Sequence, residues 1–478
     1  MRKDRGKTHL RNSGKILGFS HICTIKNKHM CIRKLIVIFL FIGSILLSAC
    51  YSSKKILPIA IEPIKIVTLP TPKDSVRSDT VLEKILQLYP QYFDSILQNR
   101  NNWNVQLIYT QIDRGANGVP LLSNYNFNLN AAKYFYPAST VKLPVVLLAL
   151  QKLNELKIAA LDKDATMITL QDFSGQTSVY NDPASPDGKP SIAQYIKKIL
   201  MVSDNDAFNR LYEFLGQEYI NTELQKRGYG DVQILHRLGI SLTGEENRHT
   251  NPIKFYGVQN DLLYDQAAKE NKKLYAKRND TIGEGYYKEN KLINEPMDFS
   301  SKNRISLEDL HNILISLVFP SRVSAAQRLN ITESDRNFVL KYMSQLPTES
   351  SIPQYAEDSV NFWPAYCKFL LLGSEKGALN KSVRIFNKVG DAYGQLTDVA
   401  YIVDFDKKIE FFLSATIYCN GDGILNDDKY DYNSIGLPFM KHLGEVIYDL
   451  ELKRSKKFPP NLSTFKYFYD KETNDFIK

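Results

Sequence analysis

The sequence predicts an α/β (α+β) domain in which an all-helical segment interrupts the strands. Two β-rich runs and an apolar helix come first, a helical middle follows, and three further β-rich runs and a last helix complete the pattern. The 478 residues suffice for one large domain or two modest ones, and the hydrophobic fraction of 43% is typical of a globular protein.

The positive charge of the chain is concentrated at its beginning. The formal net charge is +9, and residues 1–49 alone contain ten Lys or Arg residues and a single acid, Asp4. The rest of the chain is therefore close to neutral. No basic patch of the kind that binds nucleic acid is visible, so we expect no nucleic-acid partner.

Residues 30–50 have the pattern of a bacterial secretion signal. Arg33 and Lys34 precede an apolar run over 35–47, which is shorter than the roughly 20 residues that span a membrane. The sequence Leu-Ser-Ala-Cys that ends at Cys50 resembles a lipobox, in which the cysteine is lipid-modified and becomes the mature N-terminus. The alternative is an uncleaved anchor helix.

This pattern predicts the organisation of the N-terminal region. Residues 1–49 are a leader and lipoprotein signal peptide, with Met30 as the true start, and residues 50–80 are a lipidated tether rich in proline and lysine. We therefore expect the protein in the cell envelope, held by a lipid on Cys50 at the periplasmic or extracellular face of a bacterial membrane.

The elements of the domain follow in order. The run 81–97 has helical spacing interrupted by Pro90, 104–112 and 125–129 have the composition of paired strands, and 145–156 is an apolar helix. The later elements are helices at 192–200, 207–215, 307–317, 333–346 and 437–450 and strands at 386–389, 399–405 and 410–418.

Two regions have no clear periodicity. Residues 253–303 are polar and rich in lysine, asparagine and tyrosine, which indicates a long insertion. Residues 456–478 form a polar, charged tail. The sequence therefore places the folded domain at residues 81–455.

Ser139 and Lys142 stand three residues apart where the apolar helix begins. Residues at i and i+3 share one helix face, so the hydroxyl and the amine come within hydrogen-bond reach. Serine becomes a nucleophile when a neighbouring base takes its proton, and lysine is such a base when burial or a second cation lowers its pKa. The same spacing recurs at 52–55 and 463–466, but without an apolar helix behind it.

Two further short motifs follow in the chain. Ser203-Asp204-Asn205 precedes a predicted helix and is explained, taken alone, by helix capping. Lys388-Val389-Gly390 lies on a late strand. Neither motif is specific by itself.

In this order the three motifs resemble those of class A β-lactamases and, more broadly, of penicillin-recognising serine enzymes. The resemblance covers roughly residues 81–452 and implies an antiparallel sheet flanked by N- and C-terminal helices, with an all-helical subdomain inserted. It implies a serine hydrolase that forms an acyl-enzyme, with a β-lactam as substrate. It implies no cofactor and no metal.

The resemblance also implies roles for the residues of the first two motifs. Ser139 would be the acylated nucleophile and Lys142 its proton acceptor. Ser203 would relay the proton to the leaving amine. Asn205 would orient Lys142 and contact the substrate amide.

The third motif would form one wall of the substrate site. Lys388 would attract the substrate carboxylate, Gly390 would let the substrate approach the strand, and the backbone N–H groups of Ser139 and Asp391 would form the oxyanion hole. The middle residue is Val389, where the family has Thr or Ser. The hydroxyl that helps to hold the β-lactam carboxylate is therefore missing.

The deacylation step is the second departure from the family pattern. Class A enzymes carry a glutamate that positions the deacylating water, and counting from Ser203 puts its place at residues 239–241, which hold no carboxylate. Glu245 and Glu246 are the nearest acids, and one of them serves if the loop is rebuilt. The alternative is that both are ordinary surface acids.

Three functions therefore remain open. The first is acylation and hydrolysis of β-lactams. The second is a D,D-peptidase, or penicillin-binding protein, acting on peptidoglycan stem peptides, which the missing glutamate favours. The third is a non-catalytic binding protein of the cell envelope with the same fold. The valine at position 389, where the family has Thr or Ser, favours this possibility.

Overall fold

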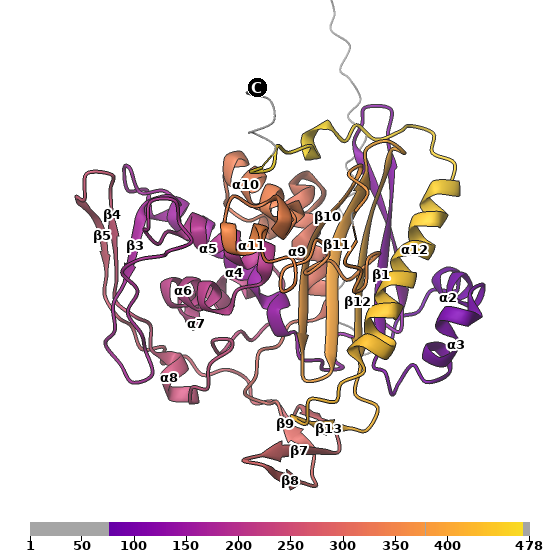
Figure 1. The fold of residues 1–478 in the computed structure, drawn as a ribbon, viewed down its shortest axis with the longest axis horizontal. Helices are drawn as coiled ribbons and strands as arrows, with labels where there is room; N and C mark the ends of the chain where they lie inside the picture. Colours follow the sequence, from indigo (N-terminus) through magenta and orange to yellow (C-terminus); the bar gives the residue numbers. More distant parts are fainter. Residues whose placement is uncertain (1–75, 378, 472–478) are drawn as a thin grey trace, which may run out of the picture. The chain divides into compact units, whose positions relative to one another are not determined.

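A five-stranded antiparallel sheet organises the domain, with strand order β10-β11-β12-β1-β2 (Figure 1). The structure is a computed structural model, and it describes residues 76–377 and 379–471. The predictions for the signal peptide, Cys50 and most of the tether fall outside these residues. All described residues belong to one compact unit, Pro63–Lys478.

The strands of this sheet form where β-branched and aromatic residues are dense. β10 and β11 are joined by Tyr393 and Gly394, whose φ angles of 52° and 74° suit the tight turn of a hairpin. The strands are β1 (Gln106–Arg114), β2 (Pro120–Phe127), β10 (Val383–Ala392), β11 (Gln395–Asp404) and β12 (Ile409–Tyr418).

Helices from both ends of the chain cover one face of the sheet (Figure 1). They are α2 (Thr80–Gln87), α3 (Pro90–Gln98) and α12 (Leu437–Lys453). Their apolar sides and the inner side chains of the strands form one buried cluster. The predicted fold class, an antiparallel sheet flanked by N- and C-terminal helices, is confirmed.

The inserted helical part and α9 lie on the other face, and they share a second buried cluster with the sheet (Figure 1). These helices are α4 (Lys142–Leu156), α5 (Ile192–Val202), α6 (Asn205–Leu215), α7 (Gln217–Lys226), α8 (Gly244–Arg248), α9 (Leu307–Val318), α10 (Glu333–Ser344) and α11 (Pro353–Ala356). The sheet thus has a hydrophobic cluster on each face, and the helical part packs directly against one of these faces.

The polar region 253–303 contains short strands that sequence periodicity does not reveal. β4 pairs with β3 on one side and with β5 on the other, and β7 pairs in parallel with β13, a strand more than a hundred residues further along the chain. The short strands are β3 (Thr166–Thr169), β4 (Ile253–Tyr256), β5 (Leu262–Gln266), β6 (Thr281–Ile282), β7 (Gly285–Lys288), β8 (Lys291–Ile293), β9 (Met297–Asp298) and β13 (Ile424–Leu425).

The segment after α12 packs onto the domain as far as it is described. Leu462, Phe465 and Tyr469 are buried, and the Phe465 ring lies 5.0 Å from that of Tyr401. Residues 456–471 therefore belong to the fold, although their sequence is that of a polar tail. Within the described part of the chain, no helix has the length and apolar character needed to cross a membrane.

Candidate active site

Ser139 lies on a short 3-10 turn, η1 (Ala138–Val141), that leads directly into α4. Every residue from Lys142 to Leu150 is buried, as expected for a helix that is apolar on all sides. Ala138 has a φ of 45°, in the left-handed region that a residue with a side chain rarely adopts. The rigid helix and the strained turn fix the position of the Ser139 hydroxyl.

Lys142 joins the first two sequence motifs. Its Nζ donates to Ser139 Oγ at 2.8 Å, to Asn205 Oδ1 at 2.7 Å and to the backbone oxygen of Ser203 at 2.5 Å. Ser203 Oγ lies 3.3 Å from the same nitrogen. The predicted contact between the serine and the lysine is present, and Asn205 holds the amine from the side.

The environment of Lys142 favours its neutral form. Burial is the main cause that lowers the pKa of this amine well below the ordinary lysine value, and the charge of Lys388 lowers it further. Asp204, Cys367 and Asp391 oppose this shift. An amine that is neutral can take a proton from a serine hydroxyl, so this environment agrees with the role predicted for Lys142.

Ser203 lies between the ends of α5 and α6, with a φ of 58°. Asp204 caps α6 by accepting from the Ala207 backbone N–H at 2.8 Å. The capping explanation therefore holds for Asp204, while its neighbours Ser203 and Asn205 face Lys142.

Lys388 reaches the same hydroxyl from the sheet. Its Nζ donates to Ser203 Oγ at 2.7 Å and to the backbone oxygen of Val389 at 3.0 Å. Ser203 Oγ thus lies within hydrogen-bond distance of both lysine amines, which agrees with the relay role predicted for it. The structure brings together Ser139, Lys142, Ser203, Asn205 and Lys388 from three distant parts of the sequence.

Gly390 lies where the edge strand β10 passes η1, the turn that bears Ser139 and is called the nucleophile turn below after the role predicted for Ser139. A Cβ at this position would lie 2.6 Å from the backbone oxygen of Pro137 and 3.0 Å from the backbone nitrogen of Ser139. Only glycine permits this approach without moving the turn. This contact holds β10, and with it Asp391, beside the turn that bears Ser139. The backbone N–H groups of Ser139 and Asp391 are the two donors of the predicted oxyanion hole.

Gly390→Ala is expected to slow acylation of Ser139 by at least ~100-fold, because the added carbon meets backbone atoms and displaces the nucleophile turn. Stopped-flow measurement of penicillin acylation checks this. Gly230→Ala is the matched control, since a Cβ there has no neighbour within 4 Å. Equal acylation rates in the two variants would show that β10 does not position Ser139.

The side chain of Val389 points away from the cluster formed by Ser139, Lys142, Ser203 and Lys388. Its side chain is 2% exposed and belongs to the apolar cluster on the α12 side of the sheet. The backbone oxygen of Val389 is what faces Lys388. The valine therefore contributes packing behind the strand, and no hydroxyl stands at this position.

The loop 235–243 closes the site on the side of α6. Gly239 has a φ of 70°, and a Cβ on it would lie 2.7 Å from Asn205 Nδ2. Asn209 fixes the loop by bonding both the N–H and the oxygen of Leu238. Gly239, the first of the three positions 239–241 at which the family pattern expects a carboxylate, thus lies against Asn205 with no room for a side chain, while Ile240 and Ser241 are exposed.

Glu245 and Glu246 have other partners. Glu246 completes a capping box with Thr243 at the start of α8 and accepts from Ser174 Oγ at 2.9 Å. Glu245 is exposed and pairs with His249 at 3.1 Å. Among the described residues, neither carboxylate has a hydrogen bond to the Ser139–Lys142 cluster.

An aromatic cluster supports the nucleophile turn from the side of the insertion. The ring of Phe299 lies 5.7 Å from Tyr136 and 5.2 Å from Tyr393, which follows β10. Tyr136 and Tyr393 are themselves 5.3 Å apart. These contacts were not predicted, because the three aromatic residues are far apart in the sequence and the insertion that contains Phe299 has no periodicity.

Comparison with known proteins gives the family. A model described as the beta-lactamase enzyme family matches residues 91–418. No curated protein matches the chain in sequence.

Solved structures of β-lactamases align with most of the chain at low identity. A β-lactamase from Xanthomonas campestris pv. campestris is 11% identical, covering 78% of this chain and 100% of that one with a TM-score of 0.41. A class A β-lactamase from Clostridium kluyveri is 14% identical, covering 75% and 98% with a TM-score of 0.40. The family match spans the sheet, the helical part and all three motifs, and the chain belongs to the beta-lactamase enzyme family.

Proposed function

We propose that the protein is a serine enzyme that becomes acylated at Ser139 by β-lactams and releases the acyl group slowly. The observation that carries this proposal is the 2.8 Å contact between Ser139 Oγ and a buried lysine amine whose pKa is lowered. Acylation needs a nucleophile and a base, and both are in place. Slow release follows from the loop at Gly239, which offers no carboxylate to activate water.

The proposed acylation uses the contacts in sequence. Neutral Lys142 accepts the proton as Ser139 Oγ attacks the lactam carbonyl, and a positioned base of this kind contributes roughly 10²- to 10⁴-fold. The Ser139 N–H stabilises the oxyanion, for which one donor is worth about 3–4 kcal/mol. Ser203, held between Lys142 and Lys388, then delivers a proton to the nitrogen that leaves.

The natural substrate in this proposal is the D-Ala-D-Ala end of a peptidoglycan stem peptide. The specific observation in favour is again Gly239, because a D,D-peptidase has no need of the water-activating glutamate of a β-lactamase. The absence of a hydroxyl at Val389 does not separate the two substrates, because a stem peptide ending in D-Ala carries a carboxylate as a β-lactam does.

The test is the intact mass of the full-length chain against time after mixing with benzylpenicillin. We expect one adduct that persists for many minutes, with the same lifetime in Glu245→Gln and Glu246→Gln, because both carboxylates are engaged elsewhere. An adduct that clears within seconds to minutes would instead mean β-lactamase turnover. If no adduct formed and penicillin stayed intact, a non-catalytic binding protein would be the better description.

The proposal includes the location of the enzyme. Both substrate classes are met outside the cytoplasm, where a lipid on Cys50 would hold the domain close to the cell wall. The support is the signal-like sequence of residues 30–50. Incorporation of labelled palmitate that is lost in Cys50→Ala would agree with this placement, and equal incorporation in both proteins would contradict it.

A further inference from the structure

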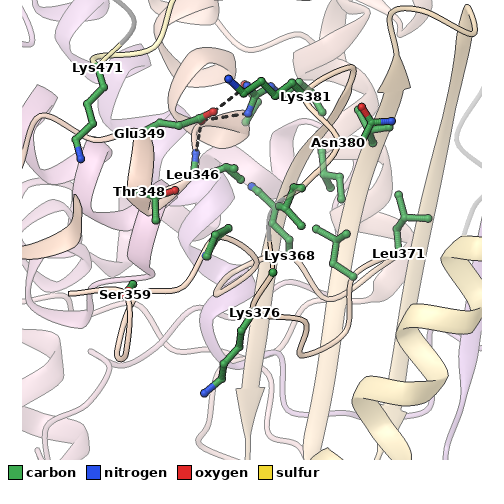
Figure 2. Close-up of a pocket in the computed structure, with 18 residues that line it drawn as sticks. Leu346, Thr348, Glu349, Ser359, Lys368, Leu371, Lys376, Asn380, Lys381 and Lys471 are labelled. Carbon is green, nitrogen blue, oxygen red and sulfur yellow. Dashed lines mark hydrogen bonds and ion pairs between the residues drawn. The ribbon is translucent and has the colours of Figure 1, made fainter. Parts of the chain in front are cut away.

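A cavity of about 670 Å³ lies beside the start of the edge strand β10 (Figure 2). It is bounded by the turn η4 (Pro347–Glu349), by residues before and at the start of β10, and by Lys471. None of the residues of the Ser139–Lys142 cluster lines it. Cavities of roughly 300–1,000 Å³ enclose small ligands in proteins, so this one is large enough for a ligand of its own.

The cavity wall is largely apolar. The side chains that contribute are Leu346, Leu371, Leu372, Leu379, Val383 and Ile385. They come from the η4 turn, the loop before β10 and the strand itself, and several remain half-buried although they are hydrophobic. A hydrocarbon group bound in the cavity would cover these side chains, and the burial of apolar surface would favour its binding.

Cationic side chains surround this apolar wall. Five cations and one carboxylate line the cavity: Lys368, Lys376, Lys381, Arg384, Lys471 and Glu349. The carboxylate is already paired, with Arg384 at 2.8 Å. Figure 2 shows Lys471, Lys381 and Lys376 on different sides of the cavity margin. Because the chain after residue 49 is close to neutral, this concentration of positive charge is a local feature.

Lys368 brings a charge into the interior. Its side chain is buried, and its Nζ donates to the backbone oxygen of Met343 at 2.6 Å and to Asn387 Oδ1 at 2.7 Å. An ammonium group has three donors, so among the described residues one of them is left for a ligand. Burial lowers the pKa of Lys368 to about 8, and a bound anion would raise it again by favouring the charged form.

We propose that this cavity binds an amphipathic anion, with one hydrocarbon chain among the leucines and one anionic headgroup at the lysines. A polar anion such as a nucleotide would leave its polar groups against the apolar wall, and a neutral hydrocarbon would leave the lysines without a counter-charge. Two sources offer the required chemistry: a free fatty-acid-like molecule and an anionic membrane lipid.

The test is calorimetric titration of the full-length chain with laurate below its micellar concentration. Lys376→Glu/Lys381→Glu is expected to weaken binding at least ~10-fold, because two exposed cations at the margin become anions. Val383→Trp, which fills the cavity with a larger ring, is expected to weaken it to a similar extent. The matched control is Lys291→Glu/Lys407→Glu, which reverses two exposed charges elsewhere and is expected to bind as the unmodified chain does.

Binding to other apolar parts of the chain is common to all these proteins and cancels in the comparison. Equal laurate affinity in the cavity variants and the control would overturn the proposal, as would dodecyltrimethylammonium binding as tightly as laurate. Sedimentation with phosphatidylglycerol vesicles that is weaker in Lys376→Glu/Lys381→Glu than in Lys291→Glu/Lys407→Glu would assign the site to a membrane lipid. Laurate binding that depends on the cavity, with equal vesicle sedimentation in these two variants, would assign it to a free amphiphile.

Discussion

Ser139→Ala is expected to abolish covalent labelling by benzylpenicillin. The hydroxyl oxygen is the atom that would carry the acyl group, and in the folded chain it is hydrogen-bonded to Lys142 Nζ. Since Ser139 is only half-buried and alanine suits the same short turn, the melting temperature is expected to stay within a few degrees. Intact mass spectrometry and thermal unfolding measure the two quantities.

The chain offers a matched control for this change. Ser463 begins a second Ser-x-x-Lys sequence, at the turn η6 (Ser463–Phe465), far from the cluster in sequence and without a buried lysine. Ser463→Ala is expected to label as fully as the unmodified protein. Labelling that survived in Ser139→Ala, or that disappeared in Ser463→Ala, would remove Ser139 as the nucleophile.

Lys142→Met is expected to lower the acylation rate by roughly 10²- to 10⁴-fold, the contribution of a positioned base. Methionine keeps the length and the packing of the buried stem but accepts no proton. The proposed base is neutral Lys142, so the acylation rate of the unmodified protein is expected to rise as pH increases through the pKa of Lys142 in the folded protein. That pKa lies well below the ordinary lysine value, which places the acid limb of the profile at low rather than high pH.

The position of this acid limb tests the cause of the shift. Lys388 is, after burial, the group that lowers the pKa of Lys142. Removing its charge in Lys388→Met raises the pKa of Lys142, so the acid limb is expected to move to higher pH. The pH dependence of the acylation rate gives the midpoint, which is independent of any loss of rate from weaker substrate binding. An unchanged midpoint would mean that Lys388 does not tune the base.

The sequence predicted those parts of the site that depend on local spacing. Ser139 and Lys142 are one helical turn apart, so their contact follows from the helix itself. The approach of Ser203 and Lys388 depends on how α5 and β10 meet across the fold, and here only the resemblance to a known family supplied the expectation. The family match confirms that resemblance, while the roles of the individual residues stay predictions.

Some features of the fold were not predicted from the sequence, either because they depend on contacts between residues that are distant in sequence or because the strands are very short. β6 and β9 have two residues each, too few for an alternating pattern, and β13 pairs with a strand from another part of the chain. Leu462, Phe465 and Tyr469 lie in a short run without regular periodicity, so nothing local indicates that these three are the buried ones. The closure of the loop at Gly239 depends on a positive φ and on Asn205, neither of which can be read from composition.

The contact at Gly390 also bears on how the protein behaves at high concentration. β10 is the outermost strand of its sheet, and such strands invite a strand of another molecule to pair with them. Here the nucleophile turn lies against Gly390, α10 packs against the strand, and Phe465 covers Phe386 at its other end. The turn that bears Ser139 therefore also covers part of this exposed edge, so that one short segment both carries the candidate catalytic hydroxyl and occupies a place where another strand could pair.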